Sequence, residues 1–388
     1  MPKHEKVVGR RNFLKAAAAL AAMPAVATSA HADDEGNHAA SHSAMSDAVA
    51  AVNLGAWMVL EKWIVPSVFQ GLKAEDEYSL GLELGAAKAS ELLRRHRDTW
   101  ITEKDFQWIA NHGLNTVRLP IGYWAVMPEA PYVNAGETLT KALQMAARYK
   151  LGVIVDLHGA PGSQNGWDHS GHAGALNWPQ PKNVEHTLKV IDNLASICEA
   201  HPCVVGIELL NEPRWDVPLE ILKDYYQRGY GVVRKHIAAN RAAVVIHDSF
   251  RPTAWSNFMQ APEFDNVILD THMYQCFTAE DQTRNLTGQI GYALNDRATQ
   301  LTAMAKELPI LVGEWSLALS GSTWSGLNRL QQSAGNRGYA AAQLLSYTAT
   351  RGWSFWTLKT EGGGGWSLQD CVKQGWMPSN LSPNGKLA

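Results

Sequence analysis

Residues 204–213 read VVGIELLNEP, a short apolar run closed by a proline. A run of this length, flanked by helical stretches, is typical of a buried strand. Side chains alternate along a strand, so Glu208, Leu210 and Glu212 should point to the same side. Pro213 cannot continue a hydrogen-bond ladder, and we therefore expect the strand to end there, with Glu212 at its C-terminal end.

Similar runs recur along the chain. We predict eight strands, at Ala51–Leu54, Thr116–Pro120, Gly152–Leu157, Val204–Leu210, Ala243–His247, Val267–Asp270, Ile310–Gly313 and Gly352–Trp356. We predict helices at Glu103–His112, Thr138–Lys150, Val184–Ala200, Pro218–Ala238, Gln289–Lys306 and Ser333–Arg351. This alternation indicates a parallel sheet, either doubly wound or closed into a barrel. No Gly-rich phosphate loop follows the first strand and eight strands favour closure, so the predicted fold class is α/β, a single-domain (β/α)8 TIM barrel.

Three stretches that follow predicted strands show little regular pattern: Val65–Trp100, Gly159–Lys182 and Trp315–Gln332. Loops after barrel strands build the active sites of such folds, so these stretches are where chemistry is expected. We expect no second domain, and a C-terminal loop, Thr357–Ala388, laid over the barrel.

The N-terminus has the features of an export signal. Residues 9–15, GRRNFLK, form a twin-arginine pattern. An Ala-rich apolar stretch follows that is too short to span a bilayer, and an A-x-A cleavage site comes after it. We predict a signal peptide at 1–32, a disordered tether at 33–48 and the barrel at 49–388, in a protein exported to the periplasm or the extracellular space.

Charge and composition restrict the class of partner. The net charge is −3, and the one basic cluster after residue 15, Arg94-Arg95-His96-Arg97, reads as a solvated face. We therefore expect no nucleic-acid partner and no membrane partner. We also expect a monomer. Trp is the most frequent aromatic residue, 15 against 11 Tyr and 8 Phe. Most of these rings should fill the core, but several could line a groove, because flat rings stack on the apolar faces of sugars.

No motif for a cofactor is present. Neither the dinucleotide pattern G-x-G-x-x-G nor the phosphate loop G-x-x-x-x-G-K-[ST] occurs. His169 and His172 are spaced like metal ligands, but no Cys or Glu partner follows, so we interpret them as part of a polar loop and expect no metal. Cys198 and Cys203 could form a disulfide or stay buried as free thiols, and four cysteines leave the pairing open.

A second strand also ends in a glutamate. Residues 310–315 read ILVGEW, and Glu314 lies at the C-terminal end of this predicted strand. Its place is the same as that of Glu212 at the end of residues 204–213. Glycoside hydrolysis needs two carboxyl groups, a proton donor facing the leaving oxygen and a carboxylate beneath the anomeric carbon. One such glutamate is more often a surface or ion-paired group, but two at the active-site end of one barrel indicate a glycosidase.

In the motifs Asn211-Glu212-Pro213 and Gly313-Glu314-Trp315 the chain resembles glycoside hydrolase family 5 of the cellulase clan, and within it the exo-β-1,3-glucanase branch. The resemblance runs from about Asn53 to Trp376. Five more segments carry it: NLGAWMVLE at 53–61, NTVRLP at 115–120, DLHGAPGSQNG at 156–166, DTHMYQ at 270–275 and FWTLKTE at 355–361. It implies a TIM barrel, a β-glucan substrate and double displacement, with Glu212 as general acid/base and Glu314 as nucleophile.

The resemblance also implies roles for residues around this pair. Asn211 would hydrogen-bond the sugar 2-hydroxyl, a contact that strengthens in the transition state. Arg118 and Tyr274 would keep Glu314 ionised and aimed, and Arg118 could also, or only, be the buried partner of Glu208. The remaining predicted site residues are His158 and His272 as hydrogen-bond donors, Glu61 at the terminal glucose, Trp356 as a stacking platform, Trp167 and Phe277 as an aromatic clamp, and Asp168 beside it.

Three hypotheses about function remain open. The first is exo-acting hydrolysis of β-1,3-glucan, and the second is an endo-acting β-glucanase or cellulase of the same family. The third is a non-catalytic carbohydrate-binding protein on a hydrolase scaffold. Such a protein would normally have lost one of the two carboxylates, and both Glu212 and Glu314 are present.

Overall fold

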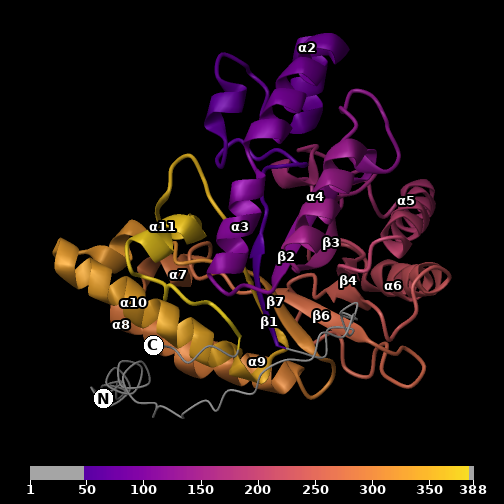
Figure 1. Cartoon of the computed structure of the whole chain (residues 1–388). Coiled ribbons are helices and arrows are strands. Elements are labelled where there is room, and N and C mark those ends of the chain that lie inside the picture. Colours follow the sequence, from indigo (N-terminus) through magenta and orange to yellow (C-terminus); the bar gives the residue numbers. More distant parts are fainter. Residues whose placement is uncertain (1–47, 384–388) are drawn as a thin grey trace, which may run out of the picture.

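The computed structural model describes residues 48–383 and shows a closed barrel of parallel strands (Figure 1). Each strand pairs with the next one, and β1 pairs with β8. The strands are β1 Val49–Asn53, β2 Thr116–Gly122, β3 Gly152–Gly159, β4 Val204–Glu208, β5 Ala243–His247, β6 Val267–His272, β7 Ile310–Trp315 and β8 Gly352–Phe355. The predicted TIM barrel is therefore confirmed.

Helices surround the strands (Figure 1). In α4 the buried residues are Leu139, Ala142, Leu143 and Ala146, the spacing of one helix face turned to the core. The helices are α2 Glu77–Thr99, α3 Glu103–Asn111, α4 Gly136–Arg148, α5 Pro181–Glu199, α6 Leu219–Arg234, α7 Ala279–Thr283, α8 Leu286–Tyr292, α9 Ala298–Met304, α10 Arg329–Ser346 and α11 Leu368–Lys373. As predicted, β5 and β6 have no helix between them in the described chain.

The interior of the barrel changes character along its axis. Near the N-terminal ends of the strands the interior is filled by an apolar cluster, formed by Val49, Ala51, Ile154, Val205, Ala243, Val245, Ile268 and Leu311. Further along the strands the buried positions become polar, with Asn53 beside Arg118, and Asp156 beside Glu208, in the strand register. Active sites of such barrels lie at the C-terminal ends of the strands, and this polar layer is the floor beneath that end.

The largest correction concerns Val65–Trp100, where the sequence showed little regular pattern. This stretch contains a short 3-10 helix, η1 Pro66–Phe69, and the long helix α2, which stands at the top of the view in Figure 1. Gly85 interrupts α2 with a φ of 72°, so the apolar period is broken in the middle. Asp76 nevertheless caps the helix through Ser79, and the buried residues of α2 pack against the segment after β1.

Other boundaries also differ. The predicted helix Gln289–Lys306 is α8, a π-helical turn η4 Ala293–Arg297 and α9. The predicted C-terminal loop contains η7 Gly364–Trp366 and α11. All four cysteines are free thiols, so the Cys198–Cys203 bridge is not formed. Between residues 48 and 383, no helix combines the length and apolarity needed to cross a membrane. The predicted signal peptide and all but the last residue of the tether lie outside the described residues.

Candidate active site

A pocket of about 990 Å³ lies where the strands end. Every strand except β2 contributes a lining residue at or just after its C-terminus, which is the arrangement that builds barrel active sites. Ten of the predicted site residues line it: Glu61, His158, Trp167, Asp168, Glu212, His272, Tyr274, Phe277, Glu314 and Trp356. The other two, Arg118 and Asn211, are fully buried: Arg118 donates to Glu314 of the lining, and Asn211 accepts from Arg118.

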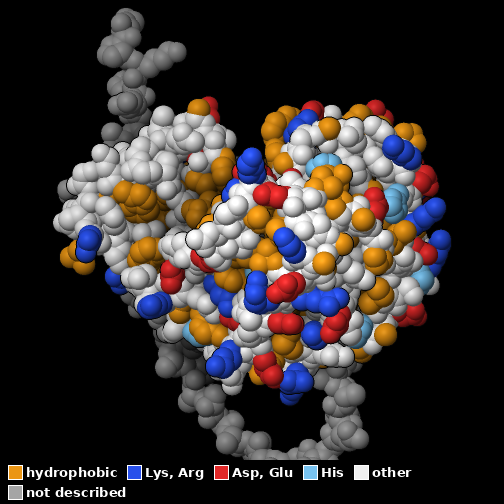
Figure 2. Space-filling model, turned by 90° about the horizontal axis from the view of Figure 1, so that it is seen from above, with side chains coloured by type: hydrophobic (Ala, Val, Ile, Leu, Met, Phe, Trp, Pro, Cys, Tyr) orange, Lys and Arg blue, Asp and Glu red, His pale blue; other side chains and the backbone are white. Residues whose placement is uncertain are grey.

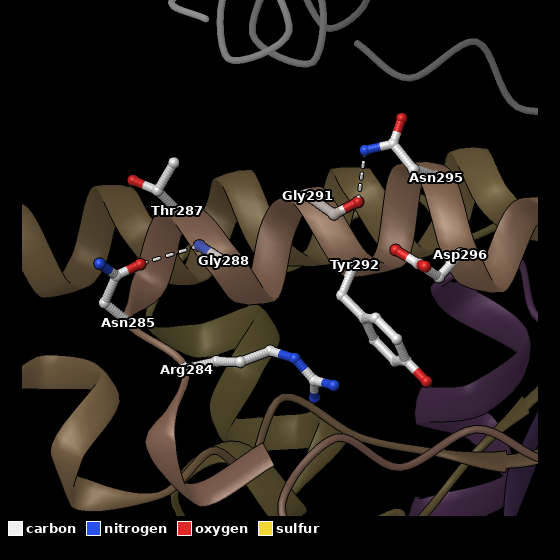
Figure 3. A pocket seen from close by; sticks show the side chains of 8 residues that line it. All are labelled: Arg284, Asn285, Thr287, Gly288, Gly291, Tyr292, Asn295 and Asp296. Atoms are coloured by element: carbon white, nitrogen blue, oxygen red, sulfur yellow. Dashed lines mark hydrogen bonds between the residues drawn. The ribbon is translucent and has the colours of Figure 1, made fainter. Parts of the chain in front are cut away.

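A second hollow, of about 400 Å³, lies along α8 and the π-helical turn (Figure 3). Its only acidic lining residue is Asp296, so it lacks a carboxylate pair. Its one aromatic ring, Tyr292, is already covered by the guanidinium groups of Arg284 and Arg297, at 3.9 and 5.1 Å from the ring centre. The chemistry therefore belongs to the larger pocket.

Glu212 reaches the pocket through an unusual backbone conformation. Strand β4 ends at Glu208, earlier than predicted, and Glu212 has a φ of 42°. Strand alternation therefore does not aim its side chain. A left-handed non-glycine residue costs on the order of 1–3 kcal/mol and persists where its surroundings impose it. Here the Gln164 amide donates to the carbonyl of Asn211 at 2.9 Å, and the Asn165 amide donates to that of Glu212 at 3.2 Å.

Glu314 is placed by β7 itself. The glycine before it is required, because a Cβ on Gly313 would lie 1.9 Å from a carboxylate oxygen of Asp270. Instead, the Gly313 N–H donates to Asp270 at 2.6 Å. The registers of β6–β7 and β7–β8 shift at this level, and such bulges re-aim side chains near active sites. Glu314 then accepts hydrogen bonds from Arg118 at 3.0 Å and from the Tyr274 hydroxyl at 2.7 Å.

The two glutamates lie close together. His272 Nδ1 is 2.5 Å from Oε1 of Glu212 and 3.4 Å from Oε2 of Glu314, so these two oxygens are at most the sum of the two distances, 5.9 Å, apart. Retaining glycosidases place their carboxyl groups about 5–5.5 Å apart, whereas inverting enzymes leave roughly 6.5–9.5 Å for a water molecule. The separation in this pocket favours the retaining geometry.

Arg118 connects the floor of the barrel to the pocket. Its Nε donates to Glu208 at 2.8 Å, and its Nη1 donates to Glu314 at 3.0 Å, so both of the contacts considered for Arg118 are made. Nη2 donates to Asn211 at 2.8 Å. A fully buried guanidinium needs such partners, since an unpaired buried charge is strongly destabilising. Its acidic neighbours are Asp156, Glu208, Asp270 and Glu314.

The pair and its neighbours share protons. Burial and the charge of Glu212 raise the pKa of Glu314 to about 7, against the opposing effects of His272, Arg118 and Tyr274. Burial also acts on Glu212, but the nearby histidines, His272 above all, outweigh it and lower the pKa of Glu212. Burial opposes protonation of His272, yet Glu314 and Glu212 raise its pKa well above the usual value. Glu212 and His272 therefore hold a proton between them, and the three groups titrate as one unit.

A third carboxylate lies in the pocket. Glu61 follows β1, is buried, and accepts a hydrogen bond from the Trp63 indole at 3.0 Å. Burial raises the pKa of Glu61 well above its usual value, and the charges of Asp168, Glu314 and Glu212 add to this effect. Glu61 is therefore electrostatically coupled to both glutamates of the pair.

Aromatic rings line the pocket in two clusters. Trp167 lies 5.9 Å from Trp215 and 6.0 Å from Phe250, while Phe277 lies 6.1 Å from Trp366. The predicted clamp residues thus belong to different clusters of the same pocket. The described chain exposes five large hydrophobic residues, and three of them are here: Trp63, Trp215 and Phe277. An exposed apolar group of this kind marks a binding surface.

Trp356 and His158 form part of the pocket floor. Their rings are nearly parallel, at 5.5 Å and 5°. His158 Nδ1 is held by Asp156 at 2.6 Å, and burial lowers the pKa of His158 to about 4, so it is neutral at physiological pH. The two histidines of the loop after β3 point to different neighbours. His169 faces Glu212, whereas the ring of His172 stacks on that of Tyr78, with the ring centres 3.8 Å apart.

Sequence reasoning missed Trp63, Trp215, Phe250 and Trp366, and it assigned His169 to a polar loop without a role at the site. A signal was available for three of the aromatic residues. Trp63 follows Glu61 by two positions, Trp215 follows Glu212 by three, and Phe250 follows β5 by three. An aromatic residue within a few positions of a candidate site glutamate, or of a barrel strand end, is a candidate for the pocket rim.

Figure 2 shows how charged side chains are distributed over one face of the molecule. There, Lys and Arg side chains are interspersed with Asp and Glu, without a large patch of one sign. This mixture agrees with the net charge of −3.

Comparison with known proteins places the chain in a family. A model of the cellulase family, glycosyl hydrolase family 5, matches residues 85–362. A probable glucan 1,3-beta-glucosidase A from Emericella nidulans is 38% identical over 383 residues, covering 88% of this chain and 93% of that protein. A glucan 1,3-beta-glucosidase from Blumeria graminis is 38% identical over 381 residues, with coverages of 86% and 87%. A rutinosidase structure from Aspergillus niger shares the fold, with a TM-score of 0.71 at 23% identity, covering 86% of this chain and 98% of that one. The chain belongs to glycosyl hydrolase family 5.

Proposed function

We propose that this protein hydrolyses β-1,3-glucan from the non-reducing end and releases glucose with retention of configuration. The observation that carries the proposal is the pair Glu212 and Glu314, buried in one pocket with two of their oxygens at most 5.9 Å apart, the sum of the 2.5 and 3.4 Å contacts to His272. The family membership and the names of the relatives, glucan 1,3-beta-glucosidases, support the substrate class.

In the first step, Glu314 attacks the anomeric carbon and the bond to the departing oxygen breaks. Glu212 gives that oxygen the proton it holds with His272, and a glycosyl ester forms on Glu314. In the second step, Glu212 takes a proton from water, and the water oxygen displaces Glu314. Two inversions give net retention.

The surrounding residues support this sequence of steps. Arg118 and Tyr274 donate to both oxygens of Glu314, which favours its carboxylate form and fixes its plane. The amide oxygen of Asn211 is held by Arg118, while its Nδ2 has no hydrogen-bond partner among the described residues. Asn211 therefore keeps a donor for the 2-hydroxyl. Trp356 offers its ring as the platform beneath the reacting sugar.

The carboxylates in the pocket lining support exo action. Glu61 and Asp168 lie near one another in the lining, on segments after β1 and β3. A carboxylate here would bind the free hydroxyls of a terminal glucose. In a glucose unit inside the glucan chain, one of these hydroxyls would be linked to the next sugar. We propose that the substrate enters by its non-reducing end, with Trp167 and Phe277 against the next sugar.

Early digestion of laminarin tests the function. We expect glucose as nearly the only small product, with the β-anomer formed first and viscosity falling slowly. Cellulose and pustulan, assayed beside laminarin, report the linkage preference. A ladder of oligosaccharides at early times would instead support the endo-acting alternative, and an α-anomeric first product would contradict retention.

Replacement of Glu61 by alanine tests the exo site. We expect kcat/KM on laminari-oligosaccharides to fall about 10- to 100-fold, because one lost hydrogen bond to a charged group is worth roughly 1.5–3 kcal/mol. Glu61→Gln is the matched control: it keeps the hydrogen-bonding shape without the charge, so kcat/KM should fall less than in Glu61→Ala. Unchanged kcat/KM in Glu61→Ala, with an unchanged melting temperature, would remove Glu61 from the site.

We also propose that the chain acts outside the cytoplasm, as a monomer, without a nucleic-acid or membrane partner. The twin-arginine pattern at residues 9–15 supports export. Cell fractionation of the full chain, compared with a variant in which Arg10 and Arg11 are replaced by lysine, would test this.

A further inference from the structure

The loop after β3 is tied to the segment that carries Glu212. Asn165 is the link: its amide donates to the Glu212 carbonyl at 3.2 Å, and its own carbonyl accepts from Arg214 at 3.0 Å. Its Oδ1 accepts from the Trp167 N–H at 2.9 Å, which continues the connection into the next turn, η3 Asp168–Ser170. His169 is carried by this turn, so its position relative to Glu212 is fixed by backbone contacts on both sides.

The two oxygens of Glu212 have different neighbours. Oε1 contacts Nδ1 of His272, which is fully buried, at 2.5 Å. Oε2 contacts Nε2 of His169 at 3.3 Å, and the His169 side chain is 18% exposed and lines the pocket. Oε2 is therefore the oxygen on the open side. A carboxylate only accepts hydrogen bonds, so Nε2 of His169 carries the hydrogen in this contact.

We propose that His169 is a positioning residue for Glu212, donating from Nε2 to Oε2 and turning that oxygen toward the departing group. The proposal rests on the proposed function, because it assigns His169 to the acid/base step of that reaction. The contact is longer than the one to His272, so it leaves Oε2 free to face the departing oxygen. When Glu212 is a carboxylate in the second step, the same N–H stabilises its charge.

The role gives a definite pH dependence. The groups facing Glu212 besides His169 are Glu61, His247, His272, Tyr274 and Glu314, and His158 faces His169. All of these remain when His169 alone is replaced. Since the His169 contact favours the Glu212 carboxylate, its loss lets Glu212 and His272 hold their shared proton to higher pH. The basic limb of the kcat/KM profile should then move upward.

Two variants separate positioning from packing. His169→Leu keeps apolar contact with Trp167 but has no donor, and His169→Gln keeps a donor. The substrates are phenyl and dinitrophenyl β-glucosides, which are similar in size but differ in how much the departing group needs a proton. For His169→Leu we expect kcat/KM to fall about tenfold on the phenyl glucoside and less than about threefold on the dinitrophenyl glucoside. The tenfold loss is smaller than the whole contribution of a general acid, about 10²- to 10⁴-fold, because Glu212 itself is still present. For His169→Gln we expect values near wild type with both.

Each other outcome has a distinct meaning. Equal losses with both glucosides in His169→Leu, or an unmoved basic limb, would overturn the positioning role and leave only loop packing. A loss confined to laminari-oligosaccharides, with both aryl glucosides unaffected, would also overturn it, because His169 would then act on the next sugar. Wild-type protein that hydrolyses neither aryl glucosides nor laminarin would refute the proposed function itself, independently of His169.

Discussion

In the Glu314→Gly variant, hydrolysis of laminarin is expected to fall by roughly 10⁴-fold or more, because the covalent intermediate can no longer form. Binding of laminari-oligosaccharides should persist, since Glu61, Trp356 and the aromatic clusters are untouched. The two quantities are measured separately, as initial rates and as dissociation constants. Glu314→Gln serves as a second variant, because it is close in shape and can keep contact with Arg118 and Tyr274.

Chemical trapping gives the same prediction a direct readout. A 2-fluoro glycoside slows the second step, so the glycosyl-enzyme should accumulate on the nucleophile. We expect peptide mapping of the wild type to find the label on Glu314. Glu212 and Glu61 are the other pocket glutamates, and both interact electrostatically with Glu314. A label on either of them would overturn the assignment, even if Glu314→Gly were inactive.

The barrel could be predicted because its signals are local. Short apolar runs separated by amphipathic helices gave the eight strands in order, and the strand ends marked Glu212 and Glu314. The helix α2 could not be predicted in this way. Gly85 interrupts its apolar period, and its burial comes from packing against the segment after β1, which only the folded chain brings together.

The geometry around Glu212 was also outside the reach of the sequence. Strand alternation suggested a side chain aimed by parity, whereas a φ of 42° aims it, held by amides of Gln164 and Asn165 from another loop. The contact from His169 depends on the same long-range arrangement. In contrast, two partners of Arg118 were expected, because Glu208 and Glu314 lie at or near strand ends that a barrel must bring to one layer. The contact between Arg118 and Asn211 was not predicted.

The Glu212→Ala variant should lose activity by about 10²- to 10⁴-fold on laminarin, where the departing sugar needs a proton. With a dinitrophenyl glucoside, which needs little assistance, the first step should still occur and the second step should become limiting, because water is no longer deprotonated. Steady-state KM should fall as the intermediate accumulates.

Added azide should then restore turnover in this variant. The azide anion needs no general base, and it can occupy the space that the shortened side chain at position 212 leaves beside the glycosyl ester on Glu314. The product should be a β-glucosyl azide, because attack from the face opposite Glu314 inverts the intermediate a second time. Wild type and Glu314→Gly are the controls, and neither should be accelerated toward this product. Two outcomes would contradict the proposed roles of acid/base for Glu212 and nucleophile for Glu314. One is an α-glucosyl azide from Glu212→Ala, and the other is formation of the β-glucosyl azide by Glu314→Gly. Azide attack on a sugar bound to Glu314 can give only the β-glucosyl azide, because Glu314 occupies the α-face. We expect this product because Glu212 and Glu314 lie at the short separation of a retaining pair, on either side of His272.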